Sequence, residues 1–249
     1  MNLTLRGINK SYPIGGLMSG ERRQILFDVS LEVEEGTCFG LVGESGSGKS
    51  TLSRLILGLE KPDSGEILLD GVPVSKGRPR GAMSAVFQDY TSSVNPYYTV
   101  LDAVSEPLVL AGIRGGSERR RRVVEALETV GLSADFLDRY PHQLSGGEAQ
   151  RVCIARSVVM RPGMLVLDEA VSSLDVSIQS QVLEMIARLR REMRLSVFFI
   201  THDMQSVTYL CDRVAFLYKG RITQNMPVSQ LSRADDPYAR ELLGAVFPF

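Results

Sequence analysis

The sequence predicts an α/β fold in which short buried strands are followed by amphipathic helices. Apolar runs at 37–42, 164–169 and 196–200 are short and almost continuously hydrophobic, which is typical of strands buried in a parallel sheet. Segments with apolar residues at offsets of three and four follow the first two runs, and this spacing predicts helices that pack on a sheet. The chain between about 90 and 156 changes to helical patterns, which predicts an inserted helical subdomain.

The amino-terminal segment is expected to form half-exposed antiparallel strands. Residues 2–8 and 25–35 alternate apolar and polar side chains, with the glycine-rich segment 15–20 as their connection. Residues 65–71 resemble a further hairpin at an edge. Tyr12 lies near the end of the first strand, where its ring either packs against the protein or stacks on an adenine ring.

The stretch between the first buried strand and the helix predicted over 50–59 has the spacing of a phosphate-binding loop. A strand that turns through glycines into a helix offers unpaired backbone N–H groups and the positive end of a helix dipole to an anion. Lys49 adds a cation for the outer phosphates, and the Ser50 hydroxyl is placed to coordinate Mg²⁺. An ordinary glycine turn is the alternative, and the flanking strand and helix argue against it. The loop comprises Gly43, Glu44, Ser45, Gly46, Ser47, Gly48, Lys49, Ser50 and Thr51.

Composition excludes several classes of protein. With 249 residues, 44% of them hydrophobic, the chain can form one core or one core with an inserted subdomain. A net charge of -1 argues against constitutive nucleic-acid binding. Three cysteines without a CxxC pair predict thiols in a reducing compartment. Neither a signal peptide nor an apolar run of about 18 residues is evident, so a membrane role would require a partner.

The middle of the chain contains a second candidate anion site. A short strand over 82–87 ends at Gln88, whose amide is either a surface group or a ligand of Mg²⁺ or attacking water. Helices are expected over 100–110 and 118–130, and the basic run 119–122 on the second is expected to be a solvated surface; a protein or acidic lipid contact is the alternative, with nucleic acid last. Ser145, Gly146 and Gly147 precede a helix expected from Glu148 to about Met160 and repeat the pattern of N–H groups offered to an anion; a plain helix cap is the alternative.

Acidic and histidine side chains follow the later strands. The run 164–169 ends in Asp168 and Glu169, which beside a phosphate-binding loop are suited to hold Mg²⁺ and to polarise an attacking water. A turn through Asp175 leads to a long amphipathic helix. His202 ends the strand 196–200 and is suited to donate to a terminal phosphate, whereas His142 is expected to be structural. A hairpin over 214–223 and a short helix over 237–243 close the chain.

Taken in this order, the motifs closely resemble the nucleotide-binding subunit of ATP-binding cassette (ABC) transporters over nearly the whole chain. The resemblance implies a RecA-like P-loop NTPase core with an antiparallel β subdomain (1–89 and 157–225), an inserted α-helical subdomain (90–156) and a carboxyl-terminal tail (226–249). By motif, 43–51 resembles the Walker A loop, 144–148 the LSGGQ signature, 165–169 the Walker B strand and 173–175 the D-loop. Gln88, His202 and Tyr12 resemble the Q-loop glutamine, the switch histidine and the adenine-stacking aromatic. Glu148 departs from the family's glutamine and is expected to tune the site rather than disable it.

The resemblance also implies a mechanism and partners. ATP and Mg²⁺ are bound by Lys49, the loop N–H groups, Ser50, Asp168 and Gln88, while Glu169 activates water and His202 steadies the terminal phosphate. Ser145 and Gly147 come from a second cassette, homologous or identical, that closes head to tail on the nucleotide. Two permease subunits and, indirectly, a solute-binding protein complete the transporter, which places the chain on the cytoplasmic face of the membrane with no nucleic-acid partner.

The branch of the family is indicated by two stretches. Residues 88–96 and the ending Asp236 to Leu243 resemble the peptide and nickel importer branch. Ala170 after the Walker B glutamate is similar to nickel-type subunits, where peptide members usually have proline, and the cysteine-bearing carboxyl extension of peptide members is absent from this sequence. The resemblance therefore favours import of nickel or a metal chelate, with a dipeptide or oligopeptide as the alternative.

Two rival classes are less consistent with the motifs. Soluble cassette proteins that act on nucleic acid or the ribosome usually carry long coiled-coil insertions or tandem cassettes, and this sequence has neither. A small-molecule kinase would not require the signature stretch or His202.

Overall fold

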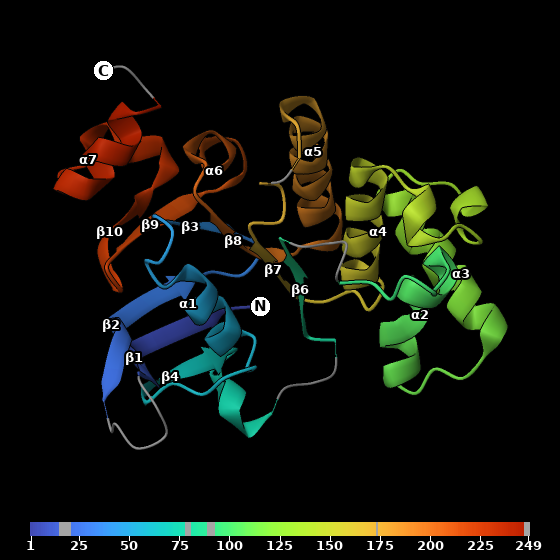
Figure 1. The fold of residues 1–249 in the computed structure, drawn as a ribbon, viewed down its shortest axis with the longest axis horizontal. Helices are drawn as coiled ribbons and strands as arrows, with labels where there is room; N and C mark the ends of the chain where they lie inside the picture. Colours follow the sequence, from blue (N-terminus) through green and yellow to red (C-terminus); the bar gives the residue numbers. More distant parts are fainter. Residues whose placement is uncertain (15–20, 78–80, 89–92, 173, 247–249) are drawn as a thin grey trace. The chain divides into compact units, whose positions relative to one another are not determined.

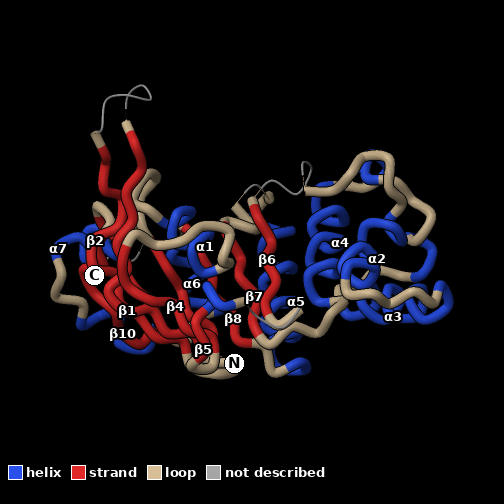
Figure 2. The backbone as a smooth tube through the Cα atoms, turned by 90° about the horizontal axis from the view of Figure 1, so that it is seen from below, coloured by secondary structure: helices blue, strands red, loops and turns tan. Residues whose placement is uncertain are grey.

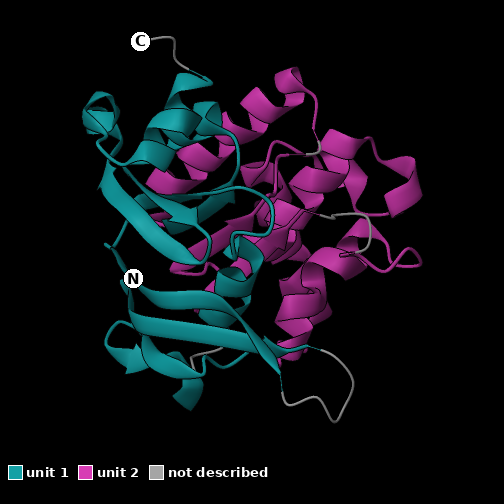
Figure 3. Ribbon diagram, turned by 60° about the vertical axis from the view of Figure 1, so that its left-hand side comes forward, with its two compact units in different colours: residues 1–78, 196–249 teal, residues 79–195 magenta. Residues whose placement is uncertain are grey.

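The computed structural model describes residues 1–14, 21–77, 81–88, 93–172 and 174–246. Figure 1 shows the order of its helices and strands. The chain divides into two compact units, Met1–Arg78 with Ser196–Phe249, and Pro79–Leu195 (Figure 3). The subdomain boundaries drawn from the sequence remain a proposal, and the expected connection at 15–20 lies outside the described residues.

The first unit contains a four-stranded antiparallel sheet (Figure 2). Its order is β2-β1-β4-β5, formed by β2 (Arg22–Val33), β1 (Leu3–Pro13), β4 (Ser64–Leu69) and β5 (Val72–Pro73). The predicted amino-terminal strands and the hairpin after Gly65 are confirmed. β1 continues to Pro13, so Tyr12 lies within the strand and pairs with Arg23.

The same unit contains the strand that leads into the glycine loop. β3 (Cys38–Val42) runs parallel to both β8 (Ser196–Thr201) and β9 (Arg213–Tyr218), and β10 (Arg221–Pro227) pairs antiparallel with β9. All five residues of β3 are buried. A strand that is paired on both sides and covered on both faces has an almost continuous apolar sequence. This is why β3 could be predicted from the sequence.

The described residues of the first unit form the helices α1 (Lys49–Ile56), α6 (Met204–Leu210) and α7 (Pro237–Gly244). The helix predicted over 50–59 was too long. Gly58 adopts a left-handed φ of 66°, and the N–H of Leu59 returns to the carbonyl of Arg54, which ends the helix. Leu59, expected on the apolar face, is consequently 63% exposed. The sequence did not predict α6. Short 3₁₀ turns cover Val74–Lys76 and Val228–Arg233.

The second unit combines a parallel strand pair with helices. β6 (Met83–Phe87) pairs with β7 (Met164–Asp168). The helices are α2 (Val100–Leu110), α3 (Gly116–Thr129), α4 (Gly146–Val158) and α5 (Val176–Met193), with 3₁₀ turns at Ala134–Phe136 and Pro141–Gln143. Figure 2 shows α2, α3 and α4 gathered together, as the helical pattern predicted. The α4 helix begins at Gly146 rather than at Glu148 because Ser145 caps it.

The three cysteines are buried thiols. Cys38 and Cys211 are distant in sequence, yet their sulfur atoms lie 3.4 Å apart without a disulfide bond. Burial raises the pKa of the Cys153 thiol to about 11, so this group stays protonated and unreactive at neutral pH.

Candidate functional site

The glycine loop joins β3 to α1 in the geometry that the sequence predicted. Gly48 caps α1 with a left-handed φ of 112°, a conformation that glycine adopts without strain. The buried Lys49 folds back so that its Nζ donates to the carbonyls of Gly43 at 2.7 Å and Glu44 at 3.0 Å. The first N–H groups of a helix have no intrahelical acceptor, so the start of α1 can accept an anion.

The loop is held closely by the β9–β10 turn. A Cβ atom on Gly43 would lie 2.3 Å from the Leu217 carbonyl oxygen, which only a glycine avoids. Gly220 donates its N–H to the Ser47 carbonyl at 3.0 Å. The buried Ser47 hydroxyl has no hydrogen-bond partner within the part of the chain that the structure describes. These features form a cradle with polar groups available for a phosphate chain.

Tyr12 is fixed by an acidic side chain. Its hydroxyl donates to Glu60 at 2.5 Å, and Glu60 also accepts from Arg54 at 3.2 Å. The Nζ of Lys10, two residues away on β1, lies 5.2 Å from the Tyr12 ring centroid. Burial and the Glu60 contact raise the pKa of Tyr12, and the Tyr12 hydroxyl lowers the pKa of Glu60, so the pair remains a neutral donor and an anionic acceptor.

His202 follows β8 directly and is exposed. The turn that carries it is fixed on both sides. Asp203 donates its N–H to the hydroxyl of Thr201 at 3.0 Å, and its carboxylate caps α6 by accepting from the Gln205 and Ser206 N–H groups at 2.9 and 3.1 Å. Tyr12, the glycine loop and His202 are therefore all in the first unit.

The predicted carboxylates lie at the end of β7 in the second unit. Asp168 is the last strand residue and is 8% exposed. Glu169 has a φ of 51°, a left-handed conformation that costs a non-glycine residue about 1–2 kcal/mol. Its carbonyl accepts from the Ser172 N–H at 3.2 Å and from the Ser172 hydroxyl at 2.9 Å, which stabilises the turn.

Gln88 emerges at the same strand edge as the carboxylates. Phe87 is the partner of Asp168 in the parallel register, so Gln88 and Glu169 are the next residues along two neighbouring strands. Gln88 is exposed. The structure thus brings together Gln88, Asp168 and Glu169, as expected from their positions after parallel strands.

Ser145 and Glu148 form a reciprocal capping box at the start of α4. The carboxylate of Glu148 accepts from the backbone N–H and the hydroxyl of Ser145, both at 2.8 Å, and the Glu148 N–H donates to the Ser145 Oγ at 3.3 Å. The Ser145 N–H is the main cause of a lowered pKa for Glu148. Arg139 lies 3.8 Å from the other carboxylate oxygen. At the position of the family glutamine, this chain therefore has an ionised carboxylate that caps α4 and whose charge is partly neutralised by Arg139.

Asp175 caps α5 close to the signature stretch. Its carboxylate accepts from the Ile178 N–H at 3.0 Å, which is the main reason that its pKa is lowered. A Cβ on Gly147 would lie 2.9 Å from Ile178, so the starts of α4 and α5 are in contact and Gly147 must be small. Ser173, the first residue of the predicted D-loop, lies outside the described residues.

Two supporting residues were missed from the sequence. Gln150 is completely buried on α4, and its amide donates to the carbonyl of Ala170 at 2.5 Å, which links the signature helix to the turn after Glu169. Its position two residues after the signature stretch 144–148 was a signal that could have identified it. Glu60, the partner of Tyr12, lies in no motif.

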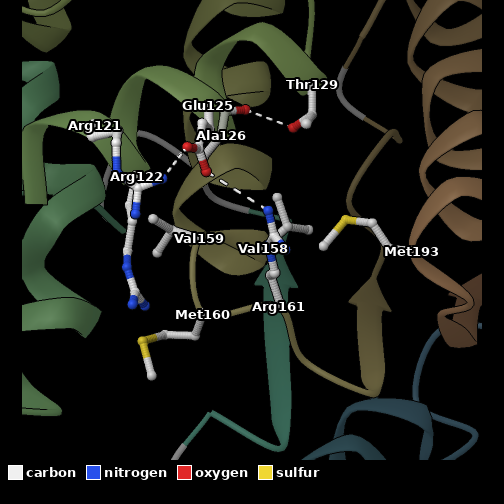
Figure 4. A pocket seen from close by; sticks show the side chains of 10 residues that line it. All are labelled: Arg121, Arg122, Glu125, Ala126, Thr129, Val158, Val159, Met160, Arg161 and Met193. Atoms are coloured by element: carbon white, nitrogen blue, oxygen red, sulfur yellow. Dashed lines mark hydrogen bonds and ion pairs between the residues drawn. The ribbon is translucent and has the colours of Figure 1, made fainter. Parts of the chain in front are cut away.

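The basic run of α3 borders a polar pocket of about 250 Å³ (Figure 4). Glu125 in this pocket contacts Arg121 at 2.5 Å and Arg161 at 3.7 Å. Arg121 and Arg122 also bind Glu118, at 2.8 and 2.7 Å. Because acidic neighbours offset these arginines, the structure supports the solvated surface expected from the sequence.

Comparison with known proteins decides the family. The family model described as ABC transporter matches residues 26–172. The chain belongs to the ABC transporter family. The cassette is 43% identical to the metal-staphylopine import system ATP-binding protein CntF of Staphylococcus aureus (strain NCTC 8325 / PS 47), over 97% of each chain. It is 40% identical to the nickel import ATP-binding protein NikE of Rhodospirillum rubrum, over 99% of this chain and 91% of the relative. A putative peptide import ATP-binding protein of Brucella ovis is 41% identical over 98% of this chain and 78% of its own.

A solved structure agrees with the fold of the cassette. The dimeric ATP-binding cassette MJ0796, in a post-hydrolysis state bound to ADP and Pi, superposes with a TM-score of 0.79. It is 30% identical and covers 91% of this chain and 98% of its own. The predicted ABC ATPase fold, the ATP-hydrolysing activity and the resemblance to the peptide and nickel importer branch are confirmed. In the described residues of the cassette, we find no helix long and apolar enough to cross a bilayer.

Proposed function

We propose that this cassette hydrolyses ATP to drive the import of nickel or a metal chelate through separate membrane permeases. The observation that carries the proposal is the near full-length similarity to a metal-staphylopine and a nickel import ATP-binding protein. Import of dipeptides or oligopeptides is the second candidate, because a putative peptide import protein is similarly close in identity.

In this proposal each residue has the role that the family resemblance implies for its motif. Lys49 and the loop N–H groups bind the phosphates, and Tyr12, held by Glu60, stacks on adenine. Glu169 polarises the attacking water, and His202 donates to the terminal phosphate. The close-packed Gly43 and the unpartnered Ser47 hydroxyl support a phosphate chain in the loop.

Mg²⁺ fits the oxygen groups at the strand edge. Hydroxyl, amide and carboxylate oxygens are ligands that Mg²⁺ prefers; Asp168 is the last residue of β7, and Gln88 directly follows the neighbouring strand β6. Ser50, exposed at the start of α1, supplies the hydroxyl. The family resemblance assigns Ser50, Gln88 and Asp168 as the Mg²⁺ ligands, and Mg²⁺ bound with ATP would neutralise phosphate charge.

A second cassette completes each site in the proposed arrangement. Ser145 and Gly147 at the start of α4 are exposed or half-buried and would contact the terminal phosphate bound by the partner subunit. The dimeric state of MJ0796 supports this assembly. Closure on ATP and release after hydrolysis would then move the permeases at the cytoplasmic face of the membrane.

An apolar pocket of about 320 Å³ in the second unit supports a protein partner there. Its lining includes Val94, Pro96, Val100 and Leu144, and the neighbouring Tyr97 side chain is 86% exposed. Exposed aromatic side chains beside an apolar hollow are typical of protein interfaces. We assign the cytoplasmic segment of a permease to this surface.

Glu148→Gln is expected to lower the KM for ATP about three- to ten-fold. The amide retains the capping box, while removal of a negative charge near the proposed terminal phosphate is worth roughly 1 kcal/mol in a well-solvated site. Steady-state ATPase assays at neutral pH measure the change in KM.

The pKa of Glu148 is lowered in the folded chain. The contribution of this carboxylate to the free energy of unfolding is therefore present above the ordinary carboxyl pKa and is lost as pH falls through the folded value.

The matched control for this charge is Arg139→Gln. Loss of the neighbouring cation unmasks the Glu148 carboxylate, so the KM for ATP should rise instead. Equal KM values in the wild type and Glu148→Gln would contradict a phosphate near α4.

The cargo is tested on the proteins encoded beside this one. We expect two permeases, a second cassette and a solute-binding protein, and we expect that binding protein to bind nickel or a nickel chelate in calorimetric titration. Binding of dipeptides without binding of metal would replace the metal proposal with the peptide one.

A further inference from the structure

The carboxyl-terminal helix α7 carries the stretch Asp236 to Leu243, which no step of the nucleotide chemistry uses. Its start is firmly anchored. The Asp236 carboxylate accepts from the Ala239 N–H at 2.9 Å and from the hydroxyl of Thr223, on β10, at 2.8 Å. Arg240 donates to the Ala234 carbonyl at 2.8 Å. These bonds fix the position of the helix against the β9–β10 hairpin.

Tyr238 connects this helix to the glycine loop. Its hydroxyl accepts from the backbone N–H of Glu44 at 2.9 Å. The Tyr238 side chain is 6% exposed, and its ring stacks on Tyr218, the last residue of β9, with centroids 4.4 Å apart. Burial is the main cause of a raised pKa for Tyr238, so the hydroxyl stays neutral across the physiological range.

The contact determines how the Glu44 peptide is held. Its N–H binds Tyr238 and its carbonyl accepts from Lys49 at 3.0 Å. If Lys49 turns to the phosphates when ATP binds, as the proposed function requires, the carbonyl loses this donor. The Tyr238 hydroxyl then remains to hold the first turn of the loop beside Gly43, which already packs on Leu217.

We propose that Tyr238 is a positioning residue of the phosphate-binding loop and that it couples α7 to nucleotide binding. The inference rests on the proposed binding of ATP phosphates by residues 43–51. The hydroxyl limits the number of conformations of the nucleotide-free loop, so binding costs less ordering. Coupling of this kind is reciprocal, so ATP must also protect α7.

The test compares Tyr238→Phe, which keeps the stacked ring, with Tyr209→Phe, which removes a hydroxyl from a side chain that is 59% exposed on α6. Loss of one neutral hydrogen bond predicts a three- to ten-fold rise in the Kd and KM for MgATP, with kcat changed less than about two-fold. Hydrogen exchange at the Glu44 amide should accelerate in nucleotide-free Tyr238→Phe. Tyr209→Phe should match the wild type in Kd, KM, kcat and Glu44 exchange.

A second measurement compares the wild type with Tyr238→Phe. Addition of MgATP should slow amide exchange in α7, and the effect should shrink in Tyr238→Phe. Unchanged Glu44 exchange in Tyr238→Phe, or equal ATP affinity in that variant and the wild type, would overturn the inference. Lys49→Ala separates the two proposals: if it abolishes ATP binding while Tyr238→Phe has no effect, only the role of Tyr238 fails. If Lys49→Ala binds ATP normally, the phosphate site itself is misplaced.

Discussion

Glu169→Gln should bind ATP but lose nearly all hydrolysis, with kcat reduced roughly 100-fold or more. General-base catalysis typically contributes 10²- to 10⁴-fold, and the amide cannot accept the proton of the attacking water. The substitution conserves shape, so the left-handed turn held by Ser172 should persist. Because ATP is proposed to join two cassettes and hydrolysis to separate them, the variant should accumulate as a closed dimer with MgATP.

Turnover and size-exclusion chromatography with MgATP measure both effects. Glu184→Gln is the matched control, since it makes the same change at an exposed position of α5 in the same unit and should retain wild-type turnover. Normal hydrolysis by Glu169→Gln would remove Glu169 from its role. A monomeric variant with bound ATP would instead contradict the shared nucleotide.

The motif residues could be predicted because their chemistry is local. A buried strand, a glycine turn and a helix start are consecutive in the chain, so 37–51 contains all the information needed for the loop. Asp168 and Gln88 could be predicted because each lies at the end of a buried apolar run, and parallel strands that end together bring such residues to one edge. Helix α1 ended earlier than predicted because the left-handed Gly58 overrode the apolar spacing.

The residues that hold these motifs could not be predicted from local patterns. Tyr12 and Glu60 are separated by 48 positions, and Tyr238 and Glu44 by 194. Only the tertiary fold brings such pairs together, and a lone glutamate or tyrosine carries no periodic signal. The same holds for Glu148. Its identity was visible as a departure from the family pattern, but the capping box and the nearby Arg139 required the structure.

Gly43→Ala is expected to weaken ATP binding by at least about 100-fold. The new Cβ would lie 2.3 Å from the Leu217 carbonyl oxygen and 2.7 Å from the Ser47 hydroxyl. The Leu217 carbonyl cannot move away easily, because the β9–β10 turn is held on two sides. Gly220 donates its N–H to the loop, and the N–H of Phe27 on β2 donates to the Gly220 carbonyl at 2.9 Å. The loop must therefore shift and lose charge-assisted bonds to phosphate, each worth about 1.5–3 kcal/mol.

Calorimetric titration with MgATP and thermal unfolding measure the consequences of Gly43→Ala. Overpacking of this kind costs about 1–3 kcal/mol, which corresponds to a Tm lowered by roughly 3–10 °C in a chain of this size. Gly244→Ala is the control, since a Cβ at the end of α7 meets no atom within 4 Å. It should leave ATP affinity unchanged and the Tm equal or slightly higher. ATP affinity within three-fold of the wild type in Gly43→Ala would show that the loop adopts another path when phosphate is bound.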